Sequence, residues 1–408
     1  MKVCVIGAGK AGGEAAREAA RGGSEVVLVD AASAPAPDWR AWPDLIFEGR
    51  RRAVASRPSP LPPEVVCSLG ARVVSLTGGW AATAGGGGFG ADAFVLASGS
   101  SFEPFAFEGR GRHGVNVLDS PGAYAGLGRD LASAERVVVA GEGVRGMQVA
   151  ERAASGGRRV TMLLSFWQHA APGRLAAQVL FDAAERKGVS VRAGRLDRAL
   201  GARGLEAVLT GGEVLPSDVL AVVPRRMPRP VPSPAAVGPG GGVLVGPEMR
   251  TTVPGVFSAG GCAELEWGPS RATLEDEQGP SGRIAGANAG GADVRISESR
   301  RFGCAVFGLS WTRMGAGVAA ARAAGLEVGT VGVRRDERSS CAIVYDRRKG
   351  TALGVETVEE EAHAEPVLVA LGGLATLRSL AYCSALGSSD ISLVSEAARL
   401  GLERWSRS

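Results

Sequence analysis

Apolar and polar positions at the start of the chain follow the order strand, helix, strand. Val3–Ile6 is a short apolar run that predicts a strand, and Glu25–Val29 predicts a second one. Between them, Glu14–Arg21 predicts a helix because small residues recur on one of its faces. That face is formed by Ala15, Ala16, Ala19 and Ala20. The pattern indicates the opening of an α/β domain with a parallel sheet.

The same order returns in the middle of the chain. Arg136–Ala140 and Val160–Leu164 predict strands, and Met147–Ala154 predicts the helix that joins them. Two copies of one strand–helix–strand unit, about 135 residues apart, predict two domains of the same kind.

The last hundred residues have a different pattern. We expect a helix over Ser310–Ala324, with Ser310 as its N-cap. Strands are expected over Leu326–Val333, Ser340–Asp346 and Ala352–Val358, followed by two more helices.

Composition narrows the class of protein. At 408 residues the chain predicts two or three domains. Hydrophobic residues at 45% and charged residues at 22% are typical of a globular protein. The net charge of +4 comes from arginines scattered among acids, which does not favour nucleic-acid binding. Since no apolar run approaches the roughly 20 residues of a membrane span and no signal peptide is seen, we expect a cytoplasmic protein.

The cysteines predict neither a disulfide framework nor a metal site. None of the six belongs to a C-x-x-C pair, and widely spaced thiols are typical of a reducing compartment. They are Cys4, Cys67, Cys262, Cys304, Cys341 and Cys383.

A glycine turn, Gly7-Ala-Gly9-Lys-Ala-Gly12, joins the first predicted strand to the first helix. Gly7 permits a tight turn, Gly9 lets the backbone approach a pyrophosphate, and Gly12 lets helix and strand pack closely. The helix N-terminus offers N–H groups and the positive end of its dipole to phosphates. Asp30 ends the second strand, where it can bind both hydroxyls of a ribose. The arrangement predicts dinucleotide binding, against the alternative of a glycine-rich turn without a ligand.

A second glycine turn, Gly141-Glu-Gly143-Val-Arg-Gly146, has less complete surroundings. The strand after it ends at Leu164 without the acid that would bind a ribose. Nicotinamide-nucleotide binding and a domain that has lost or loosened its ligand both remain open.

Three further stretches resemble the pyridine nucleotide–disulfide oxidoreductases. Asp92–Ser100 (DAFVLASGS) resembles the strand that closes their flavin domain. Asp218–Pro228 (DVLAVVPRRMP) resembles their strand ending in a G-R-x-P turn, with Pro224 in place of the glycine. Met249–Glu264 (MRTTVPGVFSAGGCAE) resembles their second flavin motif. Because the last hundred residues also resemble their dimerisation domain, the resemblance covers nearly the whole chain.

This resemblance implies an α/β fold with two nested Rossmann-like dinucleotide-binding domains and an α+β C-terminal dimerisation domain. It implies an FAD-binding domain of residues 1–115 and 240–298, an NAD(P)-binding domain of residues 116–239 and a dimerisation domain of residues 299–408. FAD, NAD(P)H and a homodimer are the implied cofactors and assembly. The residues expected to bind FAD are Gly7, Gly9, Lys10, Ala11, Gly12, Asp30, Val73, Ser98, Gly99, Gly260 and Gly261. Those expected to bind NAD(P) are Gly141, Gly143 and Gly146.

The chain departs from this family where the family's disulfide chemistry lies. Pro35–Leu45, the stretch that matches the redox cysteines, contains no cysteine, so thiol exchange with a disulfide is not expected. Ala385–Glu396, which matches the region of the catalytic histidine, contains no histidine. The three histidines of the chain fall in no motif of the family; they are His113, His169 and His363.

Two other departures concern the cofactors. Gly261 stands where relatives have an aspartate that contacts the ribityl chain and the flavin phosphate region. One lost hydrogen bond costs roughly 0.5–1.5 kcal/mol, so the change predicts weaker or altered flavin binding without excluding it. Gln148 stands where relatives often have a glutamate facing the nicotinamide, and hydride transfer does not need that acid.

The leading hypothesis is an FAD-dependent oxidoreductase that passes electrons from NAD(P)H to O2, a quinone or a small redox protein. Trp42 would either cover the flavin or be an ordinary packing residue. The main alternative is a member that has lost catalysis and acts as a structural or regulatory nucleotide-binding dimer. A third hypothesis is a disulfide reductase that uses Cys67 or Cys262 in a new position.

Overall fold

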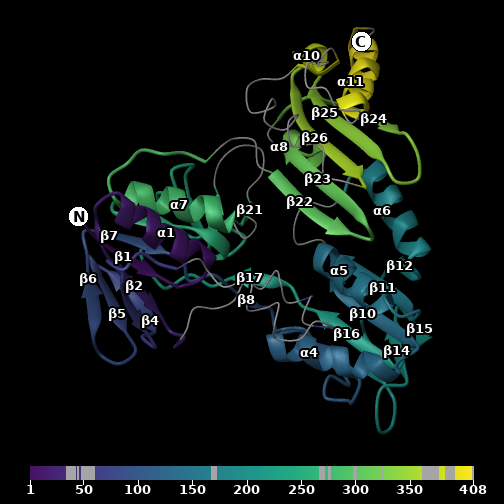
Figure 1. Cartoon of the computed structure of the whole chain (residues 1–408), viewed down its shortest axis with the longest axis horizontal. Coiled ribbons are helices and arrows are strands. Elements are labelled where there is room, and N and C mark those ends of the chain that lie inside the picture. The colour runs from purple at the N-terminus through teal and green to yellow at the C-terminus, as the bar shows by residue number, and fades with distance from the viewer. Residues whose placement is uncertain are drawn as a thin grey trace. The chain divides into compact units, whose positions relative to one another are not determined.

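Two units, each built from two separate stretches of the chain, make up the fold (Figure 1). The first unit comprises Met1–Glu103 and Arg226–Ile296, and the second comprises Pro104–Arg225 and Ser297–Ser408. The computed structural model describes residues 1–33, 43, 46, 60–166, 172–265, 272–273, 277–296, 301–323, 325–360, 376–381 and 391–406.

A five-stranded parallel sheet forms the centre of the first unit, in the order β19-β7-β1-β2-β3. Its strands are β1 (Lys2–Ile6), β2 (Glu25–Asp30), β3 (Val66–Leu69), β7 (Ala93–Leu96) and β19 (Val256–Ser258). The buried strand β1 lies between β2 and β7, with Val5 paired to Leu28 and Val95. The predicted strand–helix–strand opening is confirmed in this unit.

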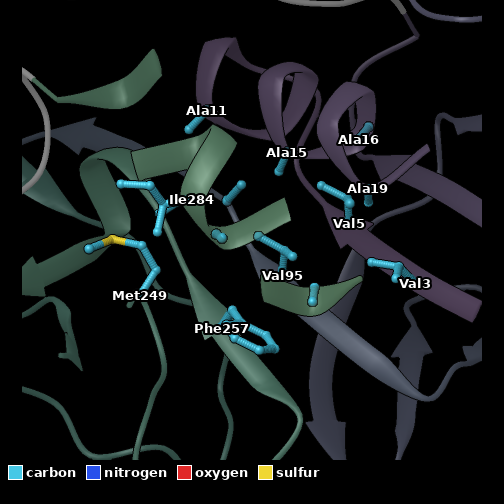
Figure 2. Close-up of a cluster of buried hydrophobic side chains, with 14 of the residues drawn as sticks. Val3, Val5, Ala11, Ala15, Ala16, Ala19, Val95, Met249, Phe257 and Ile284 are labelled. Carbon is cyan, nitrogen blue, oxygen red and sulfur yellow. The ribbon is translucent and has the colours of Figure 1, made fainter. Parts of the chain in front are cut away.

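Two helices, α1 (Lys10–Arg21) and α7 (Gln278–Ala289), pack against each other over the sheet. Their contact depends on glycine, because a Cβ added at Gly282 would lie 2.3 Å from the carbonyl oxygen of Ala11. One at Gly286 would lie 2.2 Å from the carbonyl oxygen of Ala15. Figure 2 shows the apolar core here, to which the sheet and both helices contribute.

Smaller sheets complete the first unit. A three-stranded antiparallel sheet, a two-stranded ribbon and a second three-stranded sheet connect the strands of the central sheet. Their strands are β4 (Val73–Thr77), β5 (Trp80–Thr83) and β6 (Gly88–Gly90); β8 (Ser100–Phe102) and β17 (Arg226–Pro228); and β18 (Val243–Val245), β20 (Ala263–Leu265) and β21 (Ala272–Thr273). A short 3-10 turn, Gly260–Cys262, follows β19.

The second unit contains another five-stranded parallel sheet, in the order β12-β11-β10-β16-β9. Its strands are β9 (Val115–Val117), β10 (Arg136–Glu142), β11 (Arg159–Phe166), β12 (Val189–Ala193) and β16 (Val219–Val223). The helices beside it are α4 (Pro121–Asp130), α5 (Gly143–Ala154) and α6 (Arg174–Arg186), with a 3-10 turn at Leu131–Ser133. A small antiparallel sheet follows from β13 (Arg198–Leu200), β14 (Ala207–Thr210) and β15 (Glu213–Pro216).

A five-stranded antiparallel sheet, in the order β22-β23-β26-β25-β24, belongs to the same unit. Its strands are β22 (Arg301–Val306), β23 (Leu309–Gly315), β24 (Val328–Arg334), β25 (Ser340–Asp346) and β26 (Ala352–Glu359). The helices of this part are α8 (Val318–Ala323), α10 (Leu377–Ala381) and α11 (Ile391–Ser406). Helix α6 packs against β25 and β26, which joins this sheet to the rest of the unit.

The helix expected over Ser310–Ala324 is wrong for its first half. Residues Leu309–Gly315 form β23, which pairs with β22 and β26 and buries Trp311 completely. Gly315 has φ +76°, and a Cβ there would lie 2.2 Å from the carbonyl oxygen of Leu353, so the strand ends in a tight glycine turn. Only the alanine-rich stretch after this turn forms a helix, α8, because pairing with two strands outweighs local propensity before it.

The predicted α/β class is confirmed, with two parallel sheets and an antiparallel sheet. The expected division into three domains stays a prediction. In the described ranges, no helix is both long and apolar enough to cross a bilayer.

Candidate functional site

A cavity of about 720 Å³ opens in the first unit at the carboxyl ends of β1, β2 and β7. In parallel α/β sheets, ligands bind at this edge. Residues from separate stretches of the chain form its walls. They are Ile6, Gly7, Gly9, Lys10, Ala11, Gly13, Glu14 and Arg17; Val29, Asp30 and Ala31; Ala71, Arg72, Val73 and Val74; Ala97, Ser98, Gly99 and Ser100; Arg226, Arg229, Pro230, Val231 and Pro232; and Gly261 and Gln278.

The glycines of the first turn have two different roles. Gly7 has φ +114°, and a Cβ there would lie 2.2 Å from the carbonyl oxygen of Ala97. A Cβ at Gly12 would lie 1.7 Å from the carbonyl oxygen of Gly7, so both glycines allow backbone to pack on backbone. Gly9 precedes α1, lines the cavity, and would place a Cβ in open space, with only neighbouring parts of the chain within 4 Å. The backbone at Gly9 is therefore exposed to the cavity.

Asp30 ends β2 at the mouth of this turn. Its Oδ2 accepts a hydrogen bond from the backbone N–H of Ala8 at 2.5 Å, and its Oδ1 accepts one from Ala32 at 2.7 Å. A carboxylate oxygen has a second lone pair, so the group can still accept hydrogen bonds from hydroxyls in the cavity. Asp30 lines the cavity as expected, and its binding of a ribose stays a prediction.

The cavity brings together nearly all the residues predicted to bind FAD. Gly7, Gly9, Lys10, Ala11, Asp30, Val73, Ser98, Gly99 and Gly261 all line it. Gly12 and Gly260 do not line it and serve packing instead. Gly260 has φ +70°, and a Cβ there would lie 2.7 Å from Cβ of Ala11.

Sequence reasoning missed the cavity's other side chains. The ribbon of β8 and β17 brings Arg226 and Arg229 to the wall formed by Ser98–Ser100. Ser98 donates to the carbonyl oxygen of Arg229 at 2.7 Å, and the Arg229 N–H donates to Gly99 at 3.0 Å. Gln278, at the start of α7, also lines the cavity. The arginine-rich stretch RRMPRP was the available signal for the two arginines.

The cysteines near this unit's sheet are poorly placed for redox chemistry. Cys262 is fully buried, and its Sγ lies 3.3 Å from the carbonyl oxygen of Leu96 and 3.4 Å from that of Ala259. Cys67 is exposed on β3 and is not among the cavity's lining residues. Burial raises the pKa of Cys4 to about 12, which keeps it a thiol. These positions give no support to disulfide reduction through Cys67 or Cys262.

The second glycine turn lies in the second unit. Strand β10 runs through Glu142, and α5 begins at Gly143. Gly141 has φ +136°, and a Cβ there would lie 2.0 Å from the carbonyl oxygen of Val223. Arg145, in the first turn of α5, is 3% exposed. The strand β11 continues past Leu164 to Phe166 without an acid.

Several other predicted features lie outside the described residues. These are Trp42, His169, His363, the cysteine-free stretch from Pro35 to Leu45 except for Pro43, and the first part of Ala385–Glu396. His113 is exposed, and its carbonyl oxygen accepts a backbone hydrogen bond from Leu205. Across the ranges that the structure describes, no cluster of three His, Cys, Asp or Glu side chains is arranged to hold a metal.

The first cavity fits FAD. Gly9, Gly13 and Gly99 line the cavity, and a Cβ at any of them would point into open space, with only neighbouring parts of the chain within 4 Å. The N-terminus of α1 offers N–H groups for a pyrophosphate, and Asp30 offers acceptors for a ribose. Helix N-terminus, bare glycines and acid meet in one cavity, as an extended dinucleotide requires.

Comparisons with known proteins point to one family. The profile of the family described as pyridine nucleotide-disulphide oxidoreductase matches residues 1–289. Rubredoxin-NAD(+) reductase of Pseudomonas putida is 30% identical over 288 residues, which cover 64% of this chain and 72% of that protein. The corresponding reductase of Ectopseudomonas oleovorans is 28% identical over 285 residues, with the same coverage of 64% and 72%.

Solved structures share the fold over the whole chain. A NAD-dependent persulfide reductase from A. fulgidus has a TM-score of 0.85 at 20% identity, covering 100% of this chain and 84% of that one. Putidaredoxin reductase in its covalent complex with putidaredoxin has a TM-score of 0.78 at 17% identity, covering 98% and 99%. With the family profile spanning most of the sequence, the chain belongs to the pyridine nucleotide-disulphide oxidoreductase family and is an FAD- and NAD(P)H-dependent oxidoreductase.

Proposed function

We propose that the protein passes electrons from NAD(P)H through FAD to an acceptor that is not a disulfide. The observation that carries this proposal is the absence of any thiol among the cavity's described lining residues. The stretch matching the family's redox cysteines also has none. Without a thiolate beside the cofactor, electrons cannot leave by thiol–disulfide exchange. O2, a quinone or a small redox protein is then the acceptor.

The first cavity holds FAD in this proposal. The cofactor supplies the redox chemistry, accepting a hydride and releasing electrons singly or in pairs. Gly9 and the N-terminus of α1 bind the pyrophosphate, and Asp30 binds the ribose. Gly99 lets the backbone approach the ligand closely, and Val73 offers it an apolar contact.

The second unit holds the nicotinamide nucleotide. Gly141, Gly143 and Gly146 form the turn at the N-terminus of α5, and Gln148 lies one turn further on. The proposal includes the nested arrangement of two dinucleotide-binding domains and a homodimer formed through residues 299–408. It also includes a cytoplasmic location, which the free thiols of the described cysteines support.

A small redox protein is the acceptor that the comparisons favour. Two of the most similar curated relatives are named for rubredoxin, and one solved neighbour is bound to putidaredoxin. The alternative, a member without turnover, draws on the missing ribose acid at Leu164 and on Gly261.

An anaerobic titration tests the proposal. The purified protein should be yellow, and NADH or NADPH should bleach its flavin band. A colourless protein that cannot be reconstituted with FAD contradicts the proposal. A yellow protein that neither nucleotide reduces supports the structural or regulatory alternative.

The acceptor is then identified by reoxidation. The reduced protein is mixed with oxidised rubredoxin, oxidised [2Fe–2S] ferredoxin, a water-soluble quinone or O2, and the return of the flavin band is timed. Reduction of a dithiol–disulfide substrate at a comparable rate would rule out the proposed class of acceptor.

A further inference from the structure

The cavity wall around Gly261 carries a serine and an arginine, so the position is more than a family site that has lost its acid. Gly261 is buried in the 3-10 turn after β19 and lines the cavity beside Ser100 and Arg226. A Cβ added at Gly261 would lie 3.0 Å from Oγ and 3.3 Å from Cβ of Ser100. Ser100 therefore crowds the Cβ of any other residue at position 261, which would require Ser100 to shift by a few tenths of an ångström.

Ser100 is held in this place by Arg226. The Nε and Nη2 atoms of Arg226 donate to Oγ of Ser100 at 3.0 and 2.8 Å, and Nη2 also donates to its carbonyl oxygen at 3.2 Å. The guanidinium also lies 4.7 Å from the ring centroid of Phe102. Because the hydrogen bonds and the ring both fix the guanidinium, Ser100 cannot give way cheaply to a neighbour at 261.

The same arginine changes the charge of the wall. Arg226 is 8% exposed and lines the cavity, so its positive charge is poorly screened by solvent. The lining carboxylates are those of Glu14 and Asp30. Glu14 is paired with Arg17 at 2.8 Å and Arg283 at 3.5 Å, and Asp30 lies at the end of β2. A buried guanidinium thus gives this wall of the cavity a positive charge, whereas an aspartate at 261 would bring a negative one.

We propose that Arg226, braced by Ser100, is a positioning residue that replaces the missing aspartate as the polar anchor for the flavin half of FAD. The fork of Nε and Nη2 holds Ser100, and the positive charge of the guanidinium attracts phosphate and other oxygen acceptors, whereas a carboxylate binds hydroxyls. Position 261 is then required to be glycine, and restoring the family's aspartate weakens FAD binding. The proposal rests on FAD binding in this cavity.

The test is the affinity of the flavin-free protein for FAD, measured by quenching of flavin fluorescence at two salt concentrations. Arg226→Gln should bind at least tenfold more weakly and with a smaller salt dependence, because a buried cation has been lost. Arg225→Gln is the matched control, since Arg225 is the adjacent arginine, is exposed, and does not line the cavity. It should bind FAD like the wild type.

Substitutions at Gly261 test the other half of the proposal. Gly261→Ala should weaken FAD binding through the contact with Ser100. Gly261→Asp should weaken it further, at least tenfold in all, because its carboxylate also neutralises Arg226. Equal or tighter binding by Gly261→Asp would show that the family's anchor has simply been lost, and would overturn the inference.

Arg226→Lys covers the case in which Arg226→Gln does not fold. Lysine keeps the charge without the fork, so its FAD affinity should lie between those of wild type and a tenfold loss, with the salt dependence retained. If Arg226→Lys binds FAD as tightly as the Arg225→Gln control, the fork that holds Ser100 has no role in FAD binding. A wild type that takes up no FAD overturns the proposed function itself, whereas wild-type binding with an unaffected Arg226 variant overturns this inference alone.

Discussion

The two glycine turns are close copies in sequence, yet they have different surroundings. In the first unit, the N-terminus of α1 opens onto a cavity whose rim carries Asp30. In the second, β10 passes into α5 at Gly143 without a loop between them, Arg145 is buried beside the turn, and β11 ends without an acid. The shared glycine pattern therefore reflects close backbone packing, whereas the acid that ends the following strand is present in the first of these two turns and absent from the second.

The largest expected effect separates packing glycines from the glycine that faces the cavity. Gly7→Ala and Gly141→Ala should each destabilise the protein by about 3–5 kcal/mol, because both have positive φ and would place Cβ against a carbonyl oxygen. Gly9→Ala should change stability by less than about 0.5 kcal/mol while weakening FAD binding. Urea unfolding of the flavin-free variants, followed by circular dichroism, measures the change in stability. Titration with FAD measures the change in affinity. If Gly9→Ala unfolds as easily as Gly7→Ala, the division of roles is wrong.

Asp30, the acid that follows the first glycine turn, should contribute to the affinity for FAD. Asp30→Asn should weaken FAD binding by about 10- to 100-fold, since a hydrogen bond to a charged group contributes roughly 1.5–3 kcal/mol. Asp92→Asn is the matched control, because Asp92 also accepts a backbone N–H, from Lys2 at 2.8 Å, but does not line the cavity. Isothermal titration with FAD compares the two. Similar losses in both variants would mean that Asp30 acts only on the backbone.

An acid introduced after the second glycine turn should let it bind ribose hydroxyls, as Asp30 is proposed to do after the first. Leu164→Asp is expected to raise the ratio of NADH to NADPH affinity by about tenfold, because a carboxylate binds ribose hydroxyls and repels a 2′-phosphate. Leu164→Asn is the uncharged control. The two dissociation constants, measured on the FAD-loaded protein, give the ratio. An unchanged ratio would place the ribose of the nucleotide away from Leu164.

The smallest expected effect is on stability and concerns a helix N-terminus that one of the protein's own carboxylates occupies. In the second unit, the carboxylate of Glu356 accepts a hydrogen bond from the backbone N–H of Gly173, the N-cap of α6, at 2.9 Å, and another from Nε1 of Trp311 at 3.0 Å. Burial raises the pKa of Glu356 above its ordinary value, and Arg313 acts in the opposite direction. Glu356 thus occupies at α6 the kind of site that α1 leaves open to a ligand.

The sign of the pH dependence follows from that raised pKa. Protonation of Glu356 favours the folded state, so its stabilising contribution is present below the unfolded pKa and is lost as the pH rises through the folded value. The free energy of unfolding of the wild type, relative to Glu356→Gln, should therefore fall as the pH rises above 4.5. Denaturation series at several pH values measure this difference. A difference that grows with pH would contradict the assignment.

Much of the fold was predictable because it is local. The strand over Ser340–Asp346 was placed to the residue, and both strand–glycine–helix units were found, since periodicity and glycine spacing are properties of short stretches. The strand at Leu309–Gly315 was missed because its identity depends on pairing with β22 and β26, which no short stretch displays.

The site divides in the same way. Gly9 and Asp30 were predictable because one motif of thirty residues contains them. Arg226 was not, because it reaches the cavity through the pairing of β17 with β8 far along the chain. The meaning of Gly261 also depends on Ser100, which occupies the space beside it. A missing side chain can be understood only once its neighbours are known.

The glycine seam between α1 and α7 has a consequence for the order of events during synthesis. Helix α1 is made before its partner α7, which follows only after the whole segment Pro104–Arg225 has been translated. At typical rates of 5–20 residues per second, roughly 10 to 40 s separate Glu103 from Ile296. During that interval the alanine face of α1 has no helix to cover it, and the wall that carries Arg226 and Gly261 does not yet exist. The ribosome therefore delivers the two walls of this cavity at different times, and the cavity is complete only when the second has been made.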